Sequence, residues 1–302
     1  MIRNNSLISG VKMAKTIEDG FKEFHRRLTP TDGETQAAKN HRSSIERCLR
    51  SNFEITRFFR TGSFGNGTSI RAYSDVDYFA DIPVRKLKQN SATTLREVRN
   101  VLDVRFRNTG VHVDTPAVAV PFGTDASEST EVVPAKFIET DKTGSYIYEI
   151  ADGDDGWMRS SPDALNSYVD EVDSMFSGKV KPLIRFLKAW KCYRNVPISS
   201  FYLVLRVAKY ASQESSIIYS WDVRNIFKQL LDKQLPALQD PIGISGYIYP
   251  CTMDAKKNNA LSKLDTAFTR ADKARDAEKD GKISEAFSWW NLVYAENFPA
   301  YG

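Results

Sequence analysis

Cysteine and histidine are both scarce in this sequence, with three residues of each in 302. The cysteines lie far apart, at Cys48, Cys192 and Cys251, without the close spacing of zinc ligands. An odd number of cysteines also does not suit a disulfide framework. The sequence therefore argues against a zinc centre or a disulfide-stabilised secreted domain, and we expect a reduced, cytoplasmic protein.

Long apolar runs are missing as well. No run reaches the ~18 residues needed to span a bilayer, and the first residues, "MIRNNSLISGVKMAK", lack the apolar core of a secretory signal. The net charge of +4 is small beside 42 cationic and 38 anionic residues. It is compatible with a basic cleft for an anionic ligand but does not indicate one. We expect no membrane association.

The hydrophobic pattern changes along the chain from mixed to helical. Helical periodicity is clear at residues 16–28, 34–50 and 92–106, whereas strand composition marks residues 53–60 and 74–83. The flanks of the turn-like "TDASES" are predicted to pair as a β-hairpin, formed by residues 110–123 and 130–137. After Gly153 the pattern is helical, with a break at Gly281.

These patterns predict an α+β protein. We expect an N-terminal helical lead-in (1–52), a lobe with a mixed sheet and helices (53–175), and a helical lobe at the C-terminal end (176–302). A cleft between two such lobes is a common place for a ligand.

The most informative stretch is "RTGSFGNGTSIRAYSDVDYFADIP", Arg60 to Pro83. Gly62 lets the backbone approach a phosphate closely, and the N–H groups and hydroxyl around Ser63 are suitable donors to it. Asp75 and Asp77 are two residues apart in a predicted strand, so both carboxylates leave the same face. Such a pair is suited to Mg²⁺, which prefers carboxylate and phosphate oxygens.

Simpler explanations exist for each half of this stretch. An Asp-x-Asp pair alone is usually a solvated strand face, and a Gly-Ser pair alone is usually a turn. In this order, between two predicted strands, they are much more specific. We therefore predict a phosphate and metal site here.

Two helical segments supply further candidates. In "VKPLIRFLKAWKCY" an apolar stripe lies beside a row of cations, Lys181, Arg185 and Lys188. Such a row is often only a solvated helix surface. In "ISSFYLVLRVAKY" the helix is expected to begin at Ser199 or Ser200, and one serine is explained by its place as the N-cap.

The Gly-Ser and Asp-x-Asp motifs together resemble the signature of the polymerase-β-type nucleotidyltransferases. More narrowly, the chain resembles the cGAS/DncV-like enzymes of bacteria (CD-NTases). The resemblance covers most of residues 50–301 and extends to "EVVPA" (131–135), "KVKPLIRFLKAWK" (179–191), "PISSFYL" (197–203) and the ending "SWWNLVYAENFPAY". It implies a two-lobed polymerase-β-like core with a helical C-terminal lobe.

The resemblance assigns the acidic residues to metal. Asp75, Asp77 and Glu131 would be catalytic and would hold Mg²⁺, typically two ions, with Mn²⁺ as the alternative. The third acid is usually Asp in the family and is Glu131 here, whose side chain is longer by a methylene group. Asp114, two residues after His112, is the alternative third acid.

The remaining assignments concern the nucleotide. Gly62 and Ser63 would cradle the donor triphosphate, with Lys188 reaching it and Lys181 and Arg185 as further candidates. Ser200 would contact phosphate, and Phe201 or Tyr202 would stack on a base, a contact that tolerates any base. Relatives often have Glu where this chain has Val204.

The implied enzyme is a cyclic oligonucleotide synthase, a nucleotidyltransferase that joins NTPs such as ATP, releases pyrophosphate and closes a cyclic di- or trinucleotide. In the family this second messenger binds a separate effector in anti-phage (antiviral) defence. Some members are conjugated through the C-terminal residue, here Gly302. Two alternatives stay open: an RNA-tailing nucleotidyltransferase, for which the chain shows no RNA-binding module, and a catalytically inactive nucleotide-binding regulatory protein.

Overall fold

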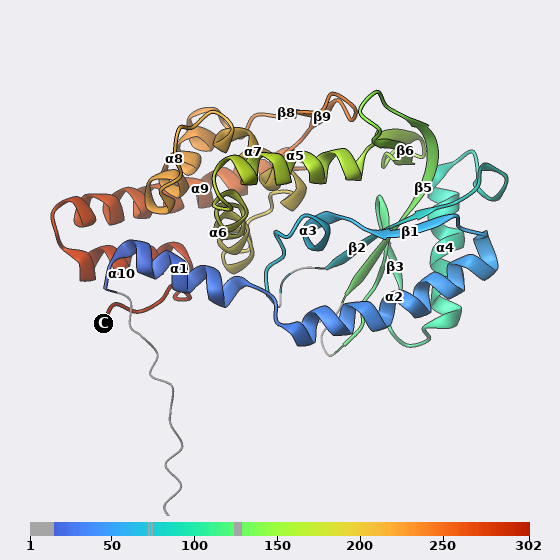
Figure 1. Cartoon of the computed structure of the whole chain (residues 1–302), viewed down its shortest axis with the longest axis horizontal. Coiled ribbons are helices and arrows are strands. Elements are labelled where there is room, and N and C mark those ends of the chain that lie inside the picture. The colour runs from blue at the N-terminus through green and yellow to red at the C-terminus, as the bar shows by residue number, and fades with distance from the viewer. Residues whose placement is uncertain (1–14, 72, 74, 124–128) are drawn as a thin grey trace, which may run out of the picture.

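The structure is a computed structural model that describes residues 15–71, 73, 75–123 and 129–302, with the backbone alone at 32–40. The predicted turn at 124–129 therefore lies outside the described residues except for Ser129, as does the N-terminal stretch before Lys15. In Figure 1 a β-sheet with two helices occupies one end of the molecule and a group of helices the other. The long helix α2 (Asp32–Phe53) runs along the sheet.

The sheet has the strand order β1-β2-β5-β4-β3, and β6 and β7 extend it from the second half of β5. The central pair, β2 and β5, is parallel, and the other pairs are antiparallel. Their bounds are β1 (Arg57–Arg60), β2 (Val76–Asp81), β3 (His112–Asp114), β4 (Ala117–Val120), β5 (Thr130–Thr140), β6 (Tyr146–Ala151) and β7 (Trp157–Ser160).

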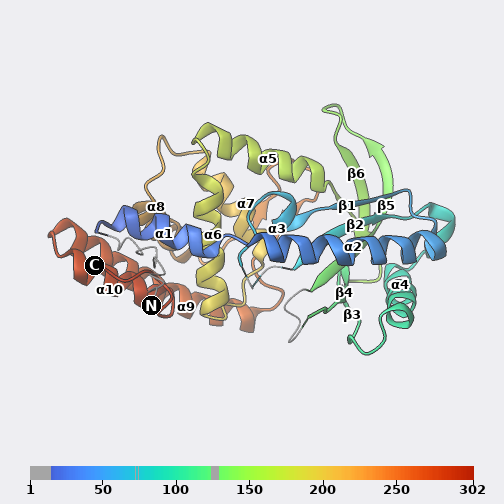
Figure 2. The same ribbon diagram turned by 60° about the horizontal axis from the view of Figure 1, so that its bottom comes forward.

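The two faces of the sheet differ because side chains alternate along each strand. From β2, Val76, Tyr78 and Ala80 are buried in a core that also holds side chains of α2 and of α4 (Ser91–Arg105). Figure 2 shows these two helices covering this side of the sheet. The other face carries Asp77 and, two residues later, Phe79, which packs in a smaller cluster with Val133 and other residues of β5 and β6. The acids therefore lie on the face that α2 and α4 leave free.

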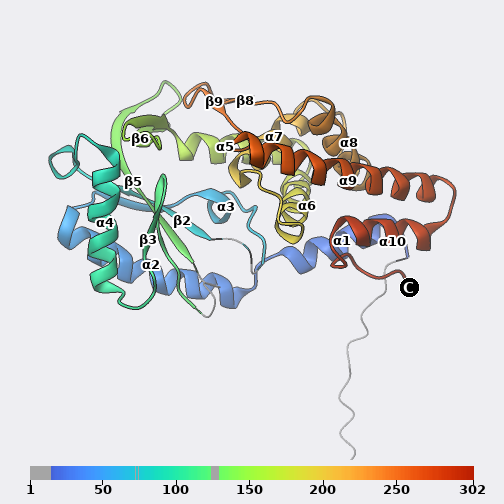
Figure 3. The ribbon, with the colours of Figure 1, turned by 180° about the vertical axis from the view of Figure 1, so that it is seen from behind.

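The helical part of the structure has its own core. Its members are α1 (Ile17–Leu28), α5 (Pro162–Met175), α6 (Val180–Tyr193), α7 (Ser200–Ala211), α8 (Tyr219–Asp232), α9 (Asp254–Lys279) and α10 (Ile283–Val293). Phe24 of α1 stacks on Phe186 of α6, with ring centroids 5.7 Å apart. Figure 3 shows α9 and α10 side by side beyond α6. Short elements complete the chain: α3 (Gly62–Gly65), the 3-10 turn η1 (Val84–Lys86), β8 (Leu238–Gln239) and β9 (Tyr247–Ile248).

Most predicted elements are present, and two differ in an instructive way. The strand predicted from Phe53 begins only at Arg57, because the spacing Ile45, Leu49, Phe53 keeps one face of α2 buried to its last residue. The segment predicted as one arm of a hairpin contains two paired strands, β3 and β4, and β4 pairs with β5 as expected. The break at Gly281 between α9 and α10 is confirmed.

The boundaries predicted at residues 52 and 175 stay predictions. Side chains of α1, together with Leu165, Val169 and Val172 of α5, share one core with the later helices. Within the described residues, no helix is both long enough and apolar enough to cross a bilayer.

Candidate active site

Asp77 and Glu131 occupy directly opposed positions on the parallel strands β2 and β5. Their carboxyl groups share a hydrogen bond, and both are partly buried. Burial raises the pKa of both carboxyls, and the neighbouring charges of Asp77 and Asp75 raise the pKa of Glu131 further. The pair therefore holds a proton more readily than ordinary carboxylates do.

Asp75 lies immediately before β2 and is the most exposed of the three predicted acids. Its carboxylate accepts a hydrogen bond from the side chain of Ser129, yet its pKa is raised, chiefly by burial of the carboxylate and to a smaller extent by the charge of Asp114. Its own charge in turn acts on Asp77 and Glu131. The structure thus brings all three predicted acids together.

The strand pairing also distinguishes Glu131 from Asp114, the alternative third acid. Glu131 is on β5, which pairs directly with the strand of Asp77. Asp114 is on β3, beyond β4 and β5 in the strand order. It is exposed there, although its charge still acts on Asp75 and Glu131. The geometry favours Glu131 as the partner of the aspartate pair.

The Gly62-Ser63 turn is packed against Asp77. The Ser63 backbone N–H donates to the Asp77 carboxylate, and the Thr61 N–H donates to the Asp77 carbonyl over 2.9 Å. Gly62 has φ +57°, and a Cβ on it would lie 1.8 Å from Asp77 Oδ2. Glycine is therefore required at this position by both backbone conformation and space. The turn and the acids form one unit.

Two predicted nucleotide ligands on α6 are engaged with the segment that follows this turn. Lys188 is buried and its Nζ donates to the Thr68 carbonyl over 3.0 Å. Arg185 Nε donates to the Ser69 carbonyl over 3.0 Å, and its Nη1 contacts His25 Nε2 of α1 at 2.6 Å. Burial lowers the pKa of Lys188 to about 8, while the nearby Asp77 charge acts in the opposite direction. In this structure both cations hold the loop in place.

Lys191, which the sequence reasoning missed, has the better position for an anion. Its Nζ donates to Ser200 Oγ over 2.8 Å, and its charge acts on Asp75. The predicted ligand Lys181 instead pairs with Asp170 over 2.7 Å. Lys191 is three residues after Lys188, so the helical period itself could have indicated it.

The residues predicted at the start of α7 have different roles in the structure. Ser199 is the N-cap and accepts a hydrogen bond from the Tyr202 N–H, so the N-cap explanation applies to Ser199. The Ser200 hydroxyl is therefore not the cap, and it accepts the hydrogen bond from Lys191. Phe201 is 46% exposed, whereas Tyr202 is fully buried and its hydroxyl donates to the Pro236 carbonyl over 2.8 Å. Of the two rings, only Phe201 is placed to meet a ligand.

The acids suit a hard divalent cation by their chemistry, since they are carboxylates that repel one another and retain a proton. Among the described residues, however, no three His, Cys, Asp or Glu side chains are already arranged around a common metal position. The carboxylates, the Gly62-Ser63 turn packed against Asp77, and Lys191, whose charge acts on Asp75, together provide groups suited to a metal-bound polyphosphate.

Comparison with known proteins agrees with this geometry. Residues 15–172 match the Second Messenger Oligonucleotide or Dinucleotide Synthetase domain (SMODS), which is more than half of the chain. No curated protein matches the sequence significantly.

Solved structures share the fold. CdnC of Escherichia coli MS115-1, solved with ATP, is 16% identical with a TM-score of 0.73, covering 94% of this chain and 99% of that one. DncV of Vibrio cholerae, a cyclic AMP-GMP synthase solved with a linear pppA(3′,5′)pG intermediate, is 15% identical with a TM-score of 0.72, covering 95% and 97%. The cyclic dinucleotide synthase CdnE of Elizabethkingia meningoseptica, solved with GTP and Apcpp, is 17% identical with a TM-score of 0.61, covering 82% and 96%.

The predicted fold is therefore confirmed, with a mixed sheet and C-terminal helices as in DncV and CdnC. The match to the SMODS domain covers the strands and turn that carry Gly62, Ser63 and the three acids. The chain belongs to the SMODS family, the cGAS/DncV-like nucleotidyltransferases, and is a nucleotidyltransferase enzyme.

Proposed function

We propose that this enzyme joins NTPs into a cyclic di- or trinucleotide by metal-dependent nucleotidyl transfer, and that the product is a signal in anti-phage defence. The observation that carries the proposal is the hydrogen-bonded Asp77–Glu131 pair beside the Gly62-Ser63 turn. The complexes of CdnC with ATP and of DncV with a linear dinucleotide support NTPs as substrates.

The residues divide the work as follows. Lys191, Ser200 and the Gly62-Ser63 turn bind the donor triphosphate, and Asp75, Asp77 and Glu131 hold Mg²⁺ or Mn²⁺. When bound, such ions offset phosphate charge and lower the pKa of an acceptor hydroxyl. The acceptor oxygen forms a bond to the α-phosphorus while the bond from that phosphorus to pyrophosphate breaks. The hydroxyl proton is released to solvent as the new bond forms, and pyrophosphate leaves with the electrons of the broken bond.

The test is incubation of the purified protein with labelled ATP and GTP, Mg²⁺ and a short RNA. Products that resist phosphatase and have the mass of a cyclic oligonucleotide support the proposal. An extended RNA would show a tailing enzyme instead, and nucleotide binding without any product would show an inactive regulatory protein. The Asp77→Asn variant, which removes one carboxylate but keeps its size, must lose the product.

Partners and location belong to the same proposal. CdnC has been solved with a HORMA protein, so we propose that a regulatory partner of this kind also binds the present enzyme. The downstream effector, conjugation at Gly302 and the cytoplasmic location stay predictions.

A further inference from the structure

Four large apolar side chains are exposed on two segments that lie against each other. Phe201 is in the first turn of α7, and Tyr247, Tyr249 and Met253 belong to the segment that runs from β9 to the start of α9. The Ser199 N–H donates to the Pro250 carbonyl over 2.8 Å, and Cys251 Sγ contacts the Pro197 carbonyl at 3.0 Å. Tyr249 is therefore anchored next to the residues that lead into Ser200 and Phe201.

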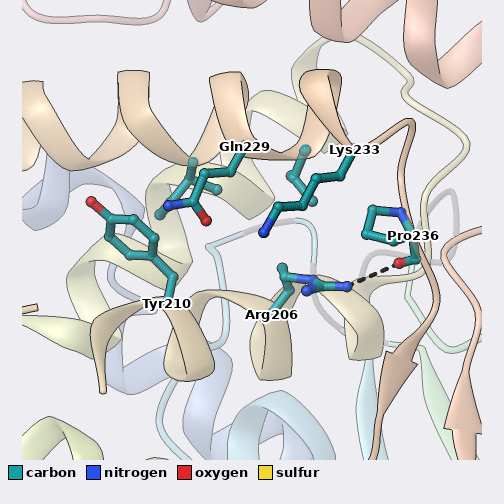
Figure 4. Close-up of a pocket in the computed structure, with 7 residues that line it drawn as sticks. Arg206, Tyr210, Gln229, Lys233 and Pro236 are labelled. Atoms are coloured by element: carbon teal, nitrogen blue, oxygen red, sulfur yellow. Dashed lines mark hydrogen bonds between the residues drawn. The ribbon is translucent and has the colours of Figure 1, made fainter. Parts of the chain in front are cut away.

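The β8–β9 hairpin that presents Tyr249 is held rigidly. Arg206 of α7 donates to the Pro236 and Ala237 carbonyls, immediately before β8, over 2.9 and 3.3 Å. Figure 4 shows Arg206 with its hydrogen bond to Pro236, beside a cavity of about 20 Å³. That volume has room for about one water, so the cavity does not hold a nucleotide.

The loop of the hairpin is fixed from within as well. The buried Asp240 carboxylate accepts hydrogen bonds from the backbone N–H groups of Ile242, Ile244 and Ser245. Together with the Ser199–Pro250 contact, these bonds tie both ends of the hairpin and its loop. Aromatic side chains exposed on such a fixed support are typical of a binding surface, because little freedom is lost when a ligand arrives.

The position of this surface indicates its ligand. Lys191 and Ser200 offer cationic and hydroxyl groups to phosphate, and the N-terminus of α7 adds its partial positive charge. A nucleotide with its phosphates there would carry its flat base beyond them, at the distance of one ribose. Phe201, 46% exposed, follows Ser200 directly, and Tyr249, 66% exposed, precedes Pro250, whose carbonyl accepts the Ser199 N–H.

We propose that Tyr249 is a second base-contacting residue, which together with Phe201 receives the base of the nucleotide bound at Lys191 and Ser200. This inference rests on the proposed function only in taking an NTP as the ligand. It assigns the binding of the base to two segments of the helical part of the molecule, away from the acids on the sheet. Aromatic stacking then predicts an affinity gain that depends on the base being present but little on its identity.

The experiment compares the binding of ATP and of inorganic tripolyphosphate, which lacks base and ribose, by calorimetry. Tyr249→Ala is expected to weaken ATP binding about tenfold and to leave tripolyphosphate binding unchanged, while Tyr249→Phe restores ATP binding. Tyr247→Ala is the matched control, since Tyr247 is 62% exposed on the same hairpin but three residues before Pro250.

Each other result overturns the inference. Unchanged ATP affinity in Tyr249→Ala would show that the ring does not touch the base. An equal loss of ATP affinity in Tyr247→Ala, or a parallel loss of tripolyphosphate binding, would show a general effect on the hairpin. If the exposed tyrosines bind a protein partner instead, ATP affinity would be unchanged in both variants. Product formation by the unaltered enzyme is scored separately, so an inactive protein that still binds ATP refutes the proposed reaction without refuting Tyr249.

Discussion

Glu131 and Asp77 share a hydrogen bond across two parallel strands, and each keeps its pKa raised in the absence of a cation. A group with a folded-state pKa above its unfolded value stabilises the folded protein at low pH, and that stability is lost as pH rises through the folded pKa. Both the stability of the protein and its affinity for a divalent ion should therefore depend on pH.

We therefore expect the melting temperature of the metal-free protein to fall between pH 5 and pH 8, and Mg²⁺ to raise it most at pH 8. Protons leave the pair as pH rises, so the apparent Mg²⁺ affinity increases in the same direction. Thermal unfolding at several pH values, with Mg²⁺ and with EDTA, measures both effects. Glu131→Gln must flatten the pH dependence, and an unchanged slope in this variant would show that the pair is not responsible.

A second pH effect has the opposite sign and acts at lower pH, so the two effects oppose each other where their pH windows overlap. Burial and the neighbouring Arg185 lower the pKa of His25 to about 4, so the unfolded chain binds a proton there that the folded chain does not. Stability is then lost as pH falls from about 6.5 to about 4, on the order of 2 kcal/mol. Urea unfolding of His25→Gln should show less loss in this window. The exposed His112→Gln is the control and should follow the parent protein.

Gly62→Ala should abolish product formation. The alanine would have to keep the left-handed φ of Gly62, and its methyl group would overlap Asp77 Oδ2. The turn and the carboxylate must therefore both move. Gly144→Ala is the matched control, because Gly144 also has a left-handed φ, +86°, but nothing lies within 4 Å of its added Cβ. Labelled-NTP turnover compares the two, and a Gly62→Ala enzyme as active as Gly144→Ala would contradict the packing argument.

Lys188 and Lys191 should respond differently to replacement by methionine. Lys188→Met leaves the buried Thr68 carbonyl without its donor, at a cost of about 1–3 kcal/mol, and is expected to lower the melting temperature by several degrees. Lys191→Met removes an anion ligand and should raise KM for NTP about tenfold, with little change in melting temperature. Steady-state kinetics and thermal unfolding of both variants decide the matter. A stable Lys188→Met protein with a raised KM would return Lys188 to the role of phosphate ligand.

Much of the site could be predicted from local sequence. Gly62, Ser63, Asp75 and Asp77 lie within one short stretch, and their chemistry follows from residue type and strand periodicity. Glu131 needed the family resemblance, because only the parallel pairing of β2 with β5 puts it opposite Asp77. The roles of Lys188 and Lys191 could not be distinguished, since both project from α6 and only tertiary contacts decide which one meets a loop carbonyl.

The fold shows the same division between local and distant information. Helices with a clear period and a breaker, such as α9 and α10 around Gly281, follow from sequence. The joint packing of α1 with helices more than a hundred residues later depends on contacts that no local pattern contains. The hairpin of Tyr249 is of this kind, because two-residue strands carry too little pattern to be recognised.

In the proposed reaction, the hydrogen bond between Lys191 and Ser200 affects turnover as well as affinity. A lysine already immobilised by a hydroxyl does not lose its rotational freedom again when an anion arrives, so the anion only exchanges one partner for another. The same exchange runs backwards when pyrophosphate departs, because Ser200 is there to take the ammonium group back. Because Ser200 replaces pyrophosphate as the partner of Lys191, the lysine does not hold the product back.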